Sequence, residues 1–254
     1  MLIARAITHQ NAPRGADSRG CYDAAVTDDS PDLFSRIFAS WRSKVLMLVL
    51  LVPLFNLFYF LPQWVGWRTP GRLPMTVIDR IVPFDPGWVY AYVSMYVMLT
   101  IPPLLTARGD VLWRYTIGAT IMFVGAAVAF LLWPVEFPRP TLPADGPWMY
   151  RVVVSIDRPI NSIPSLHAGI VGYTLCFAGR ALTDLSRSAR RAILVVGALW
   201  SALILYATLA TKQHYFLDLP PGILLAWISH SIAWLGADRA QDTPQPEVIA
   251  ALAS

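Results

Sequence analysis

Six long apolar runs limit what this chain can fold into. Each run approaches the ~20 residues that a helix needs to cross a bilayer. Backbone polar groups cannot stay unpaired in lipid, and the runs are too continuous for the alternating strands of a membrane barrel, so we expect helices. The sequence thus predicts an all-α polytopic membrane protein with six transmembrane helices: Val45–Leu61, Trp88–Leu105, Tyr115–Trp133, Ser165–Ala181, Ala192–Ala210 and Tyr215–Leu235.

Polar segments flank this membrane domain, which we place at residues 45–235. Residues 1–44 form a predicted N-terminal tail without an early apolar core, so we expect no signal peptide. Residues 236–254 form a short polar C-terminal tail. Charged residues make up 14% of the chain, against roughly 25% in a soluble globular protein, which also favours a membrane protein.

The distribution of Lys and Arg predicts the orientation of the chain. With the N-terminus in the cytoplasm, 13 of the 20 Lys and Arg residues fall on the cytoplasmic side and 7 outside, as the positive-inside rule requires. Both termini are then cytoplasmic. The loop 134–164 and the turn 211–214 lie together on the other face, which would be the periplasm, the exterior or a lumen.

Two classes of site find little support. The basic residues are scattered over loops, so no nucleic-acid partner is predicted, because such binding needs a clustered basic face. Cys21 lies in the polar tail and Cys176 within an apolar run. We expect no disulfide between them, and no cysteine or histidine spacing predicts a zinc site.

Two histidines converge on the predicted outer face. His167, in "NSIPSLHAGI", stands at the entrance to the fourth span, and His214, in "KQHYFLDLPPG", at the end of the fifth. Asp218 follows His214 by four residues, a spacing that places both side chains on one face of a helix. A carboxylate bonded to one ring nitrogen fixes the tautomer and leaves the other nitrogen as a nucleophile or base.

Four basic residues occupy the same outer segments and could bind a phosphate. Two histidines, a carboxylate and several cations together predict phosphoryl transfer through a phosphohistidine. The four basic residues are Arg139, Arg151, Arg158 and Lys212.

"PSLHA" and "HYFLD" resemble the second and third signatures of the type 2 phosphatidic acid phosphatase superfamily, P-S-G-H and S-R-x-x-x-x-x-H-x-x-x-D. Leu166 and the H-Y-x-x-D pattern are most similar to the branch of inositol phosphorylceramide and sphingomyelin synthases. The resemblance spans about residues 45–235 and implies a metal-independent enzyme without a cofactor. It implies that His214 attacks phosphorus, Asp218 orients His214, His167 protonates the departing alcohol, and Ser165 with nearby backbone N–H groups binds phosphate.

The sequence departs from the family pattern at the phosphate clamp. The first signature, K-x-x-x-x-x-x-R-P, fits Arg151 to Arg158-Pro159 with Arg in place of Lys, and we favour Arg158 as a phosphate ligand. Arg139-Pro140 is the rival, with Leu132 at the Lys position. Ala207 and Thr208 replace the Ser-Arg of the third signature, and Lys212 could supply the missing cation.

Other interpretations stay open. Asp218 precedes Pro220 and Pro221 and could be only a helix N-cap, while Asp157 and Asn161 are more typical of turns or caps. The predicted enzyme acts on a phosphorylated membrane lipid, with water as acceptor if it is a phosphatase and a second alcohol if it is a transferase. The rival functions are a non-catalytic lipid carrier and a scaffold.

Overall fold

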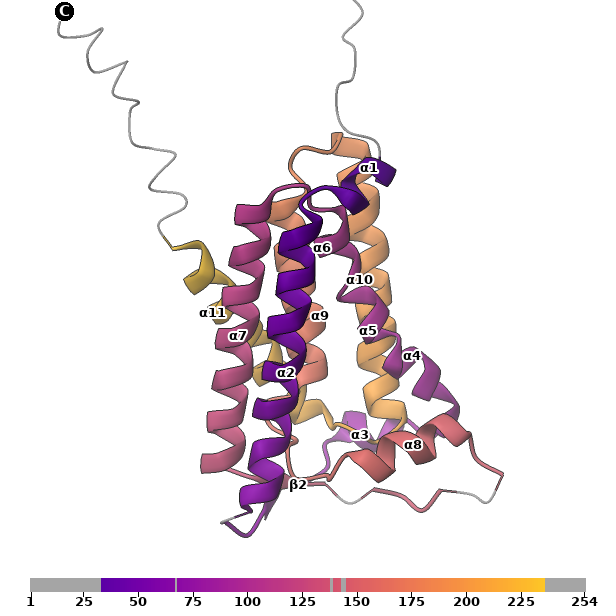
Figure 1. Cartoon of the computed structure of the whole chain (residues 1–254). Coiled ribbons are helices and arrows are strands. Elements are labelled where there is room, and N and C mark those ends of the chain that lie inside the picture. Colours follow the sequence, from indigo (N-terminus) through magenta and orange to yellow (C-terminus); the bar gives the residue numbers. More distant parts are fainter. Residues whose placement is uncertain (1–32, 67, 138, 143–144, 236–254) are drawn as a thin grey trace, which may run out of the picture. The chain divides into compact units, whose positions relative to one another are not determined.

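The computed structural model describes residues 33–66, 68–137, 139–142 and 145–235 (Figure 1), so most of the predicted N-terminal tail and all of the C-terminal tail lie outside the described residues. Helices dominate, with two short strands. The elements are α1 (Leu33–Phe38), α2 (Trp41–Val65), β1 (Gly71–Arg72), α3 (Val77–Ile81), η1 (Pro86–Trp88), α4 (Val89–Val93), α5 (Met95–Met98), α6 (Ile101–Leu105), α7 (Gly109–Leu132), β2 (Val135–Glu136), α8 (Trp148–Ile156), α9 (Leu166–Ala181), α10 (Arg187–Ala210), η2 (Phe216–Asp218) and α11 (Leu219–Trp234).

Five of the six predicted spans have the length and hydropathy to cross a membrane. Within the described residues they are Trp41–Val65, Pro86–Leu105, Gly109–Leu132, Arg187–Ala210 and Phe216–Trp234. The remaining one is the fourth predicted span in chain order, Ser165–Ala181, and it corresponds to α9. The 16 residues of α9 extend about 24 Å, which is less than the ~30 Å hydrocarbon core. The prediction of an α-helical protein with apolar spans is confirmed for five of them.

The second span is not one continuous helix. It is divided into η1, α4, α5 and α6, with Pro102 and Pro103 in the first turn of α6. Proline lacks the backbone N–H that a continuing helix needs, and it is best tolerated in the first turn. The Ser94 and Thr100 hydroxyl groups donate to the carbonyls of Ala91 and Val97, three residues earlier, which also competes with regular helical bonding.

Helix α9 lies at the centre of the bundle. Ten of its 16 residues are buried, and it contacts α5, α6, α7, α10 and α11, while α2 packs along α7. The contact with α11 is very close, because a Cβ on Gly222 would lie 2.2 Å from the carbonyl oxygen of Ser165. Only glycine at 222 permits this approach, which brings the start of α11 against the start of α9 (Figure 1).

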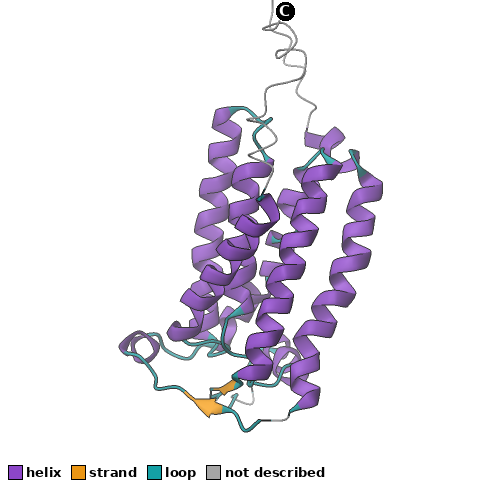
Figure 2. Ribbon diagram, turned by 90° about the vertical axis from the view of Figure 1, so that its left-hand side faces the viewer, coloured by secondary structure: helices purple, strands orange, loops and turns teal. Residues whose placement is uncertain are grey.

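The connecting segments collect at one end of the bundle, here called the loop end: residues 66, 68–88, 133–137, 139–142, 145–165 and 211–218, together with the first turn of α9. Strands β1 and β2 pair in parallel there, with Gly71 opposite Val135 (Figure 2), and α3 and α8 lie nearby (Figure 1). Helix α1 and the α9–α10 connection lie at the opposite end, here called the tail end (Figure 1). Both histidines singled out in the sequence belong to the loop end.

Candidate active site

The imidazole of His214 lies between two other site residues. Its Nδ1 is 3.0 Å from Oδ2 of Asp218, and its Nε2 is 3.3 Å from Nδ1 of His167. His167 and His214 are only 8% and 7% exposed, and Asp218 is fully buried. Because a carboxylate only accepts hydrogen bonds, Nδ1 of His214 donates to Asp218. Nε2 of His214 then carries the lone pair and accepts from His167.

Asp218 reaches His214 by a different route from the helical spacing expected from the sequence. Residues 211–215 form a turn, and Asp218 ends the 3-10 helix η2. Its Oδ2 also accepts a hydrogen bond of 3.1 Å from the backbone N–H of Tyr215. Asp218 does occupy the N-cap position of α11, but its side chain makes no capping bond there. The carboxylate orients His214, so the purely capping interpretation does not describe this residue.

His167 is held at the start of α9. Ser165 is the N-cap, and its hydroxyl accepts a 3.3 Å bond from the Ala168 N–H. The backbone N–H of Ser165 donates to the carbonyl oxygen of Asp218 at 3.0 Å, which joins the two histidine segments directly. The His167 ring also stacks on Tyr92 of α4, with ring centroids 4.0 Å apart and planes inclined by 25°. Both imidazoles are therefore fixed in position.

Two buried polar atoms of this cluster have no hydrogen-bond partner among the described residues. They are Nε2 of His167 and Oδ1 of Asp218. Buried polar groups are nearly always bonded in proteins, and an unbonded group costs about 1–3 kcal/mol. The first turn of α9 adds backbone N–H groups, and a helix N-terminus favours anions. This cluster therefore has the capacity to bind a polar, negatively charged group.

The turn that carries His214 is fastened by α3 and α8. The Lys212 ammonium group donates to the carbonyl oxygens of Asp79 at 2.7 Å and Val82 at 2.6 Å. The Asp79 carboxylate accepts from the Phe216 N–H at 2.7 Å. Burial lowers the pKa of Lys212, and the charge of Asp79 acts in the opposite direction. Lys212 thus binds α3 through both of these bonds.

Asp79 is a functional candidate that the sequence prediction missed. It forms a capping box with Thr76 at the start of α3 and is 2% exposed. The pattern T-x-x-D in "TVID" is a recognisable helix-start signal, but a cap motif does not reveal that the same carboxylate binds a distant loop.

Helix α8 also binds the turn that carries His214. The Tyr150 hydroxyl of α8 donates to the Thr211 carbonyl at 3.1 Å.

Arg139 is half of a nearly buried ion pair with Asp157. Its guanidinium donates to Oδ2 of Asp157 at 2.6 Å and to the backbone carbonyl of the same residue at 2.5 Å. The two side chains are 10% and 16% exposed. Arg139 also interacts electrostatically with Tyr92, the ring that stacks on His167. Its charge opposes the rise that burial causes in the pKa of Tyr150. Arg139 is therefore held at the loop end by Asp157.

Asp157 holds Arg139 with help from α2. The Tyr59 hydroxyl and the Gln63 amide donate to Oδ1 of Asp157 at 2.6 and 3.2 Å. The Asn161 amide donates to the Tyr59 carbonyl at 2.7 Å. Asp157 is the C-cap of α8, as a turn or cap residue should be, yet its side chain joins three segments around one arginine. No local sequence pattern indicates this second role.

The other two predicted arginines point elsewhere. The Arg158 side chain is exposed, and its guanidinium donates to the Gln63 carbonyl near the end of α2, at 3.3 Å. Arg151 is exposed on α8 and donates to the Gly146 carbonyl at 3.3 Å. The structure thus brings His167, His214, Asp218 and Ser165 together with Arg139 nearby, and it gives Arg158, Arg151 and Lys212 backbone carbonyl partners instead.

No group of three or more His, Cys, Asp or Glu residues within the described ranges is placed to hold a metal ion. Cys176 is a free thiol, and Cys21 lies outside the described residues.

Comparisons with known proteins agree with the motifs. The family model described as the PAP2 superfamily matches residues 113–242, which include α9, the His214 turn and α11. No curated protein matches the chain, and no solved structure does. The match does not separate the synthase-like branch from the rest of the family. Since the matched segment covers about half of the sequence and contains the whole histidine cluster, the chain belongs to the PAP2 superfamily, whose members are generally phosphatases or phosphotransferases.

Proposed function

We propose that this protein is an integral membrane lipid phosphatase or phosphotransferase that works through a phosphohistidine on His214. The observation that carries the proposal is the His214 ring, bonded on one side to buried Asp218 and facing His167 on the other. A carrier that only binds head groups has no need for a carboxylate that orients a nucleophile. PAP2 membership and the apolar spans support the coarser conclusion, a membrane protein of the phosphatase type.

In the proposed reaction, Nε2 of His214 attacks the phosphorus of the lipid phosphate. The bond between phosphorus and the lipid oxygen breaks as the nitrogen–phosphorus bond forms. His167 gives a proton to the departing oxygen, and Asp218 stabilises the positive charge on the His214 ring. Water or a second alcohol then attacks the phosphohistidine while His167 takes a proton from it. The phosphate must enter between the two imidazoles, so their 3.3 Å contact separates on binding.

We assign the phosphate clamp to Arg139, Ser165 and the first N–H groups of α9. Arg139 is favoured over Arg158 because its side chain is only 10% exposed and is held by Asp157, whereas Arg158 is exposed and bonded to Gln63. An arginine fork binds phosphate oxygens in pairs. Arg158 stays the second candidate. Lys212 and Arg151 act through the loops that they hold.

The proposed enzyme crosses the membrane six times, with α9 as the fourth span in chain order. Both termini lie in the cytoplasm, and the site lies on the other face. To test this, single cysteines replace Asp145 at the loop end and Thr183 at the tail end in a background without Cys21 and Cys176. A membrane-impermeant thiol reagent should label residue 145 in intact cells and residue 183 only after lysis. The reverse pattern would place the site in the cytoplasm.

The mechanism is tested by turnover of a lipid phosphate by the purified protein in detergent. Wild type should release the alcohol and form an acid-labile phosphoenzyme from phosphorus-labelled substrate. His214→Ala should show neither, a loss beyond the roughly 10⁴-fold limit of general acid catalysis. Equal turnover by wild type and His214→Ala would refute the phosphohistidine. Binding without turnover by wild type would instead support the lipid carrier.

The acceptor decides between phosphatase and transferase. We propose that the resemblance to the sphingomyelin synthase-like branch reflects a substrate whose phosphate bears a head group. Supplying a lipid phosphodiester with candidate alcohols as acceptors and separating the products tests this. The phosphorylated head group as the sole phosphorus product besides the substrate, at every alcohol concentration, would leave hydrolysis alone.

A further inference from the structure

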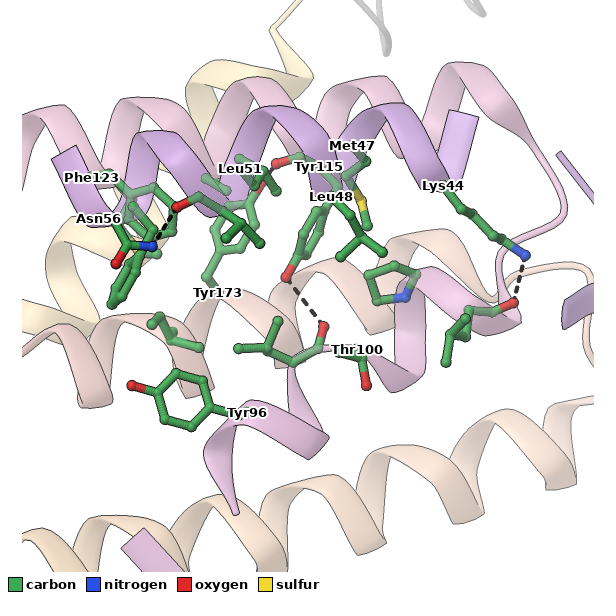
Figure 3. Close-up of a pocket in the computed structure, with 18 residues that line it drawn as sticks. Lys44, Met47, Leu48, Leu51, Asn56, Tyr96, Thr100, Tyr115, Phe123 and Tyr173 are labelled. Atoms are coloured by element: carbon green, nitrogen blue, oxygen red, sulfur yellow. Dashed lines mark hydrogen bonds between the residues drawn. The ribbon is translucent and has the colours of Figure 1, made fainter. Parts of the chain in front are cut away.

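A large apolar cavity lies inside the helical bundle, apart from the histidine cluster. Its volume is about 600 Å³, and it is enclosed by α2, α5, α6, α7 and α9 (Figure 3). Lys44 stands at one end of the lining side chains and Asn56 and Phe123 stand toward the other. Because Lys44 and Asn56 are 12 residues apart on α2, the cavity runs about 18 Å along the bundle. This size is typical of ligand pockets.

Five of the polar side chains along the wall, those other than Tyr96, donate hydrogen bonds to the protein. The Lys44 ammonium group donates to the carbonyls of Arg36, Ile37 and Leu104, at 2.6, 3.1 and 2.7 Å. The amide nitrogen of Asn56 and the hydroxyls of Thr100, Tyr115 and Tyr173 also donate to backbone carbonyls. An occupant would therefore meet hydrocarbon and satisfied donors along this wall. Only a chain without polar groups fits there at no cost in lost hydrogen bonds.

The cavity approaches the histidine cluster along two of its walls. Ile170 in the wall follows His167 by three residues on α9. Tyr96 follows Tyr92, the ring that stacks on His167, by four residues. Residues three or four apart lie about one turn apart on the same face. The end of the cavity remote from Lys44 is therefore about one helical turn from the His167 ring.

A third wall gives the same result. Phe55 of α2 stacks on Tyr59 at a centroid distance of 5.4 Å, and Tyr59 donates to Asp157, the partner of Arg139. Tyr96 also interacts electrostatically with Asp157. Three helices thus place the same end of the cavity next to the histidines and the proposed phosphate-binding arginine, while the Lys44 end points away from them.

The cavity also has a side opening. Leu48 and Val52 on α2, and Tyr96 and Leu104 on the facing segment, line the cavity and are 40–56% exposed. They lie along apolar helices that have the length to span a bilayer. A hydrocarbon chain could therefore enter sideways from lipid, between α2 and the broken second span, without crossing water.

We propose that this cavity binds one hydrocarbon chain of the lipid substrate, with the phosphate at the histidines and the chain end toward Lys44. The inference rests on the proposed function for the position of the phosphate. Because Lys44 closes the cavity with all three of its ammonium hydrogens engaged, the cavity sets a limit on chain length. The preferred substrate is thus a lipid phosphate with a straight chain that reaches but does not pass Lys44.

The first test measures kcat/KM for straight-chain alkyl phosphates of increasing length. Each methylene group that enters the cavity should raise kcat/KM about fourfold, until the chain reaches Lys44 and the increase stops. Leu51→Trp fills the middle of the cavity and should end the increase at a shorter chain. Val49 lies on the same helix and is 62% exposed, so Val49→Trp should leave the dependence of kcat/KM on chain length unchanged. Ratios of long- to short-chain substrates are compared within each variant.

The second test does not depend on turnover or on a variant that folds. An alkyl phosphate with a diazirine at the chain end is photolysed in wild-type enzyme, and the labelled peptides are identified by mass spectrometry. We expect labels near Met47 and Leu104. Labels elsewhere on the bundle, together with turnover that is independent of chain length, would overturn the inference and leave the proposed function intact. Labels near Met47 without any turnover would keep the tail site and reject the proposed enzyme.

Discussion

Two buried polar clusters in this bundle differ in how completely their polar atoms are bonded. At the tail end, Lys44 is 6% exposed and gives its three ammonium hydrogens to three carbonyls. At the loop end, His167 and His214 are similarly buried, yet Nε2 of His167 and Oδ1 of Asp218 find no partner in the described part of the chain. Burial alone therefore does not distinguish a structural cluster from a site.

The difference lies in what each cluster satisfies. Lys44 bonds the last carbonyls of α1 and α6, which no helix can satisfy internally. Its position is explained by the fold alone. The histidine cluster bonds only some of its own atoms, and the cost of the unbonded ones is recovered when a ligand supplies the partners. A buried cluster with unfilled bonding positions is the better candidate for function.

After the complete loss expected for His214→Ala, the largest effect in the comparison comes from His167→Ala at the loop end. A general acid is worth about 10²–10⁴-fold, so turnover of an alkyl phosphate should fall by that factor. Turnover of an aryl phosphate should fall far less, because its leaving group needs little protonation. The measurement is kcat/KM for both substrates. An equal loss on both would show that His167 binds or positions the phosphate and does not supply the proton.

A smaller effect separates the two arginines near the cluster. Losing a hydrogen bond to a charged group costs about 1.5–3 kcal/mol, or about 10- to 150-fold, so Arg139→Ala should raise KM or lower kcat/KM within that range. Arg158→Ala, the matched control, should change kcat/KM little. Arg139→Lys should recover only part of the activity, because an ammonium group cannot replace the fork.

A larger loss of kcat/KM in Arg158→Ala than in Arg139→Ala would support the assignment that the sequence favoured, with Arg158 as the phosphate ligand. In that case Arg158 would supply the arginine of the first signature, and Arg139 would serve only to hold Asp157. Assaying Asp157→Asn in parallel shows which role Arg139 has. The asparagine side chain has nearly the same size as the aspartate, but without the negative charge it binds the Arg139 guanidinium more weakly.

The sequence predicted what depends on local pattern and failed where distant loops meet. Apolar runs were enough to place five spans, and counting the spans was enough to bring His167 and His214 to one end. The contact between His214 and Asp218 exists, but the expectation that one helix carries both residues was wrong. The chain turns at His214, and α11 begins only after Asp218. Asp79 and Asp157 carry cap signals only, and their partners lie 137 and 18 residues away. No local pattern reports such a bond.

The smallest effect tests the structural half of the comparison. In Lys44→Met the stem of the side chain is kept and the ammonium group is lost, so the carbonyls of Arg36, Ile37 and Leu104 lose their common donor. Leaving buried acceptors unbonded costs about 1–3 kcal/mol, and the unfolding temperature of the purified protein in detergent should fall accordingly. Arg42→Met removes an exposed charge from the same turn of α2 and should leave it nearly unchanged. Lys44→Arg should recover part of the loss, since the guanidinium can still donate to the two helix ends. An unfolding temperature equal to that of Arg42→Met would mean that the three carbonyls find other donors. Complete bonding would then no longer separate the Lys44 cluster from the histidine cluster.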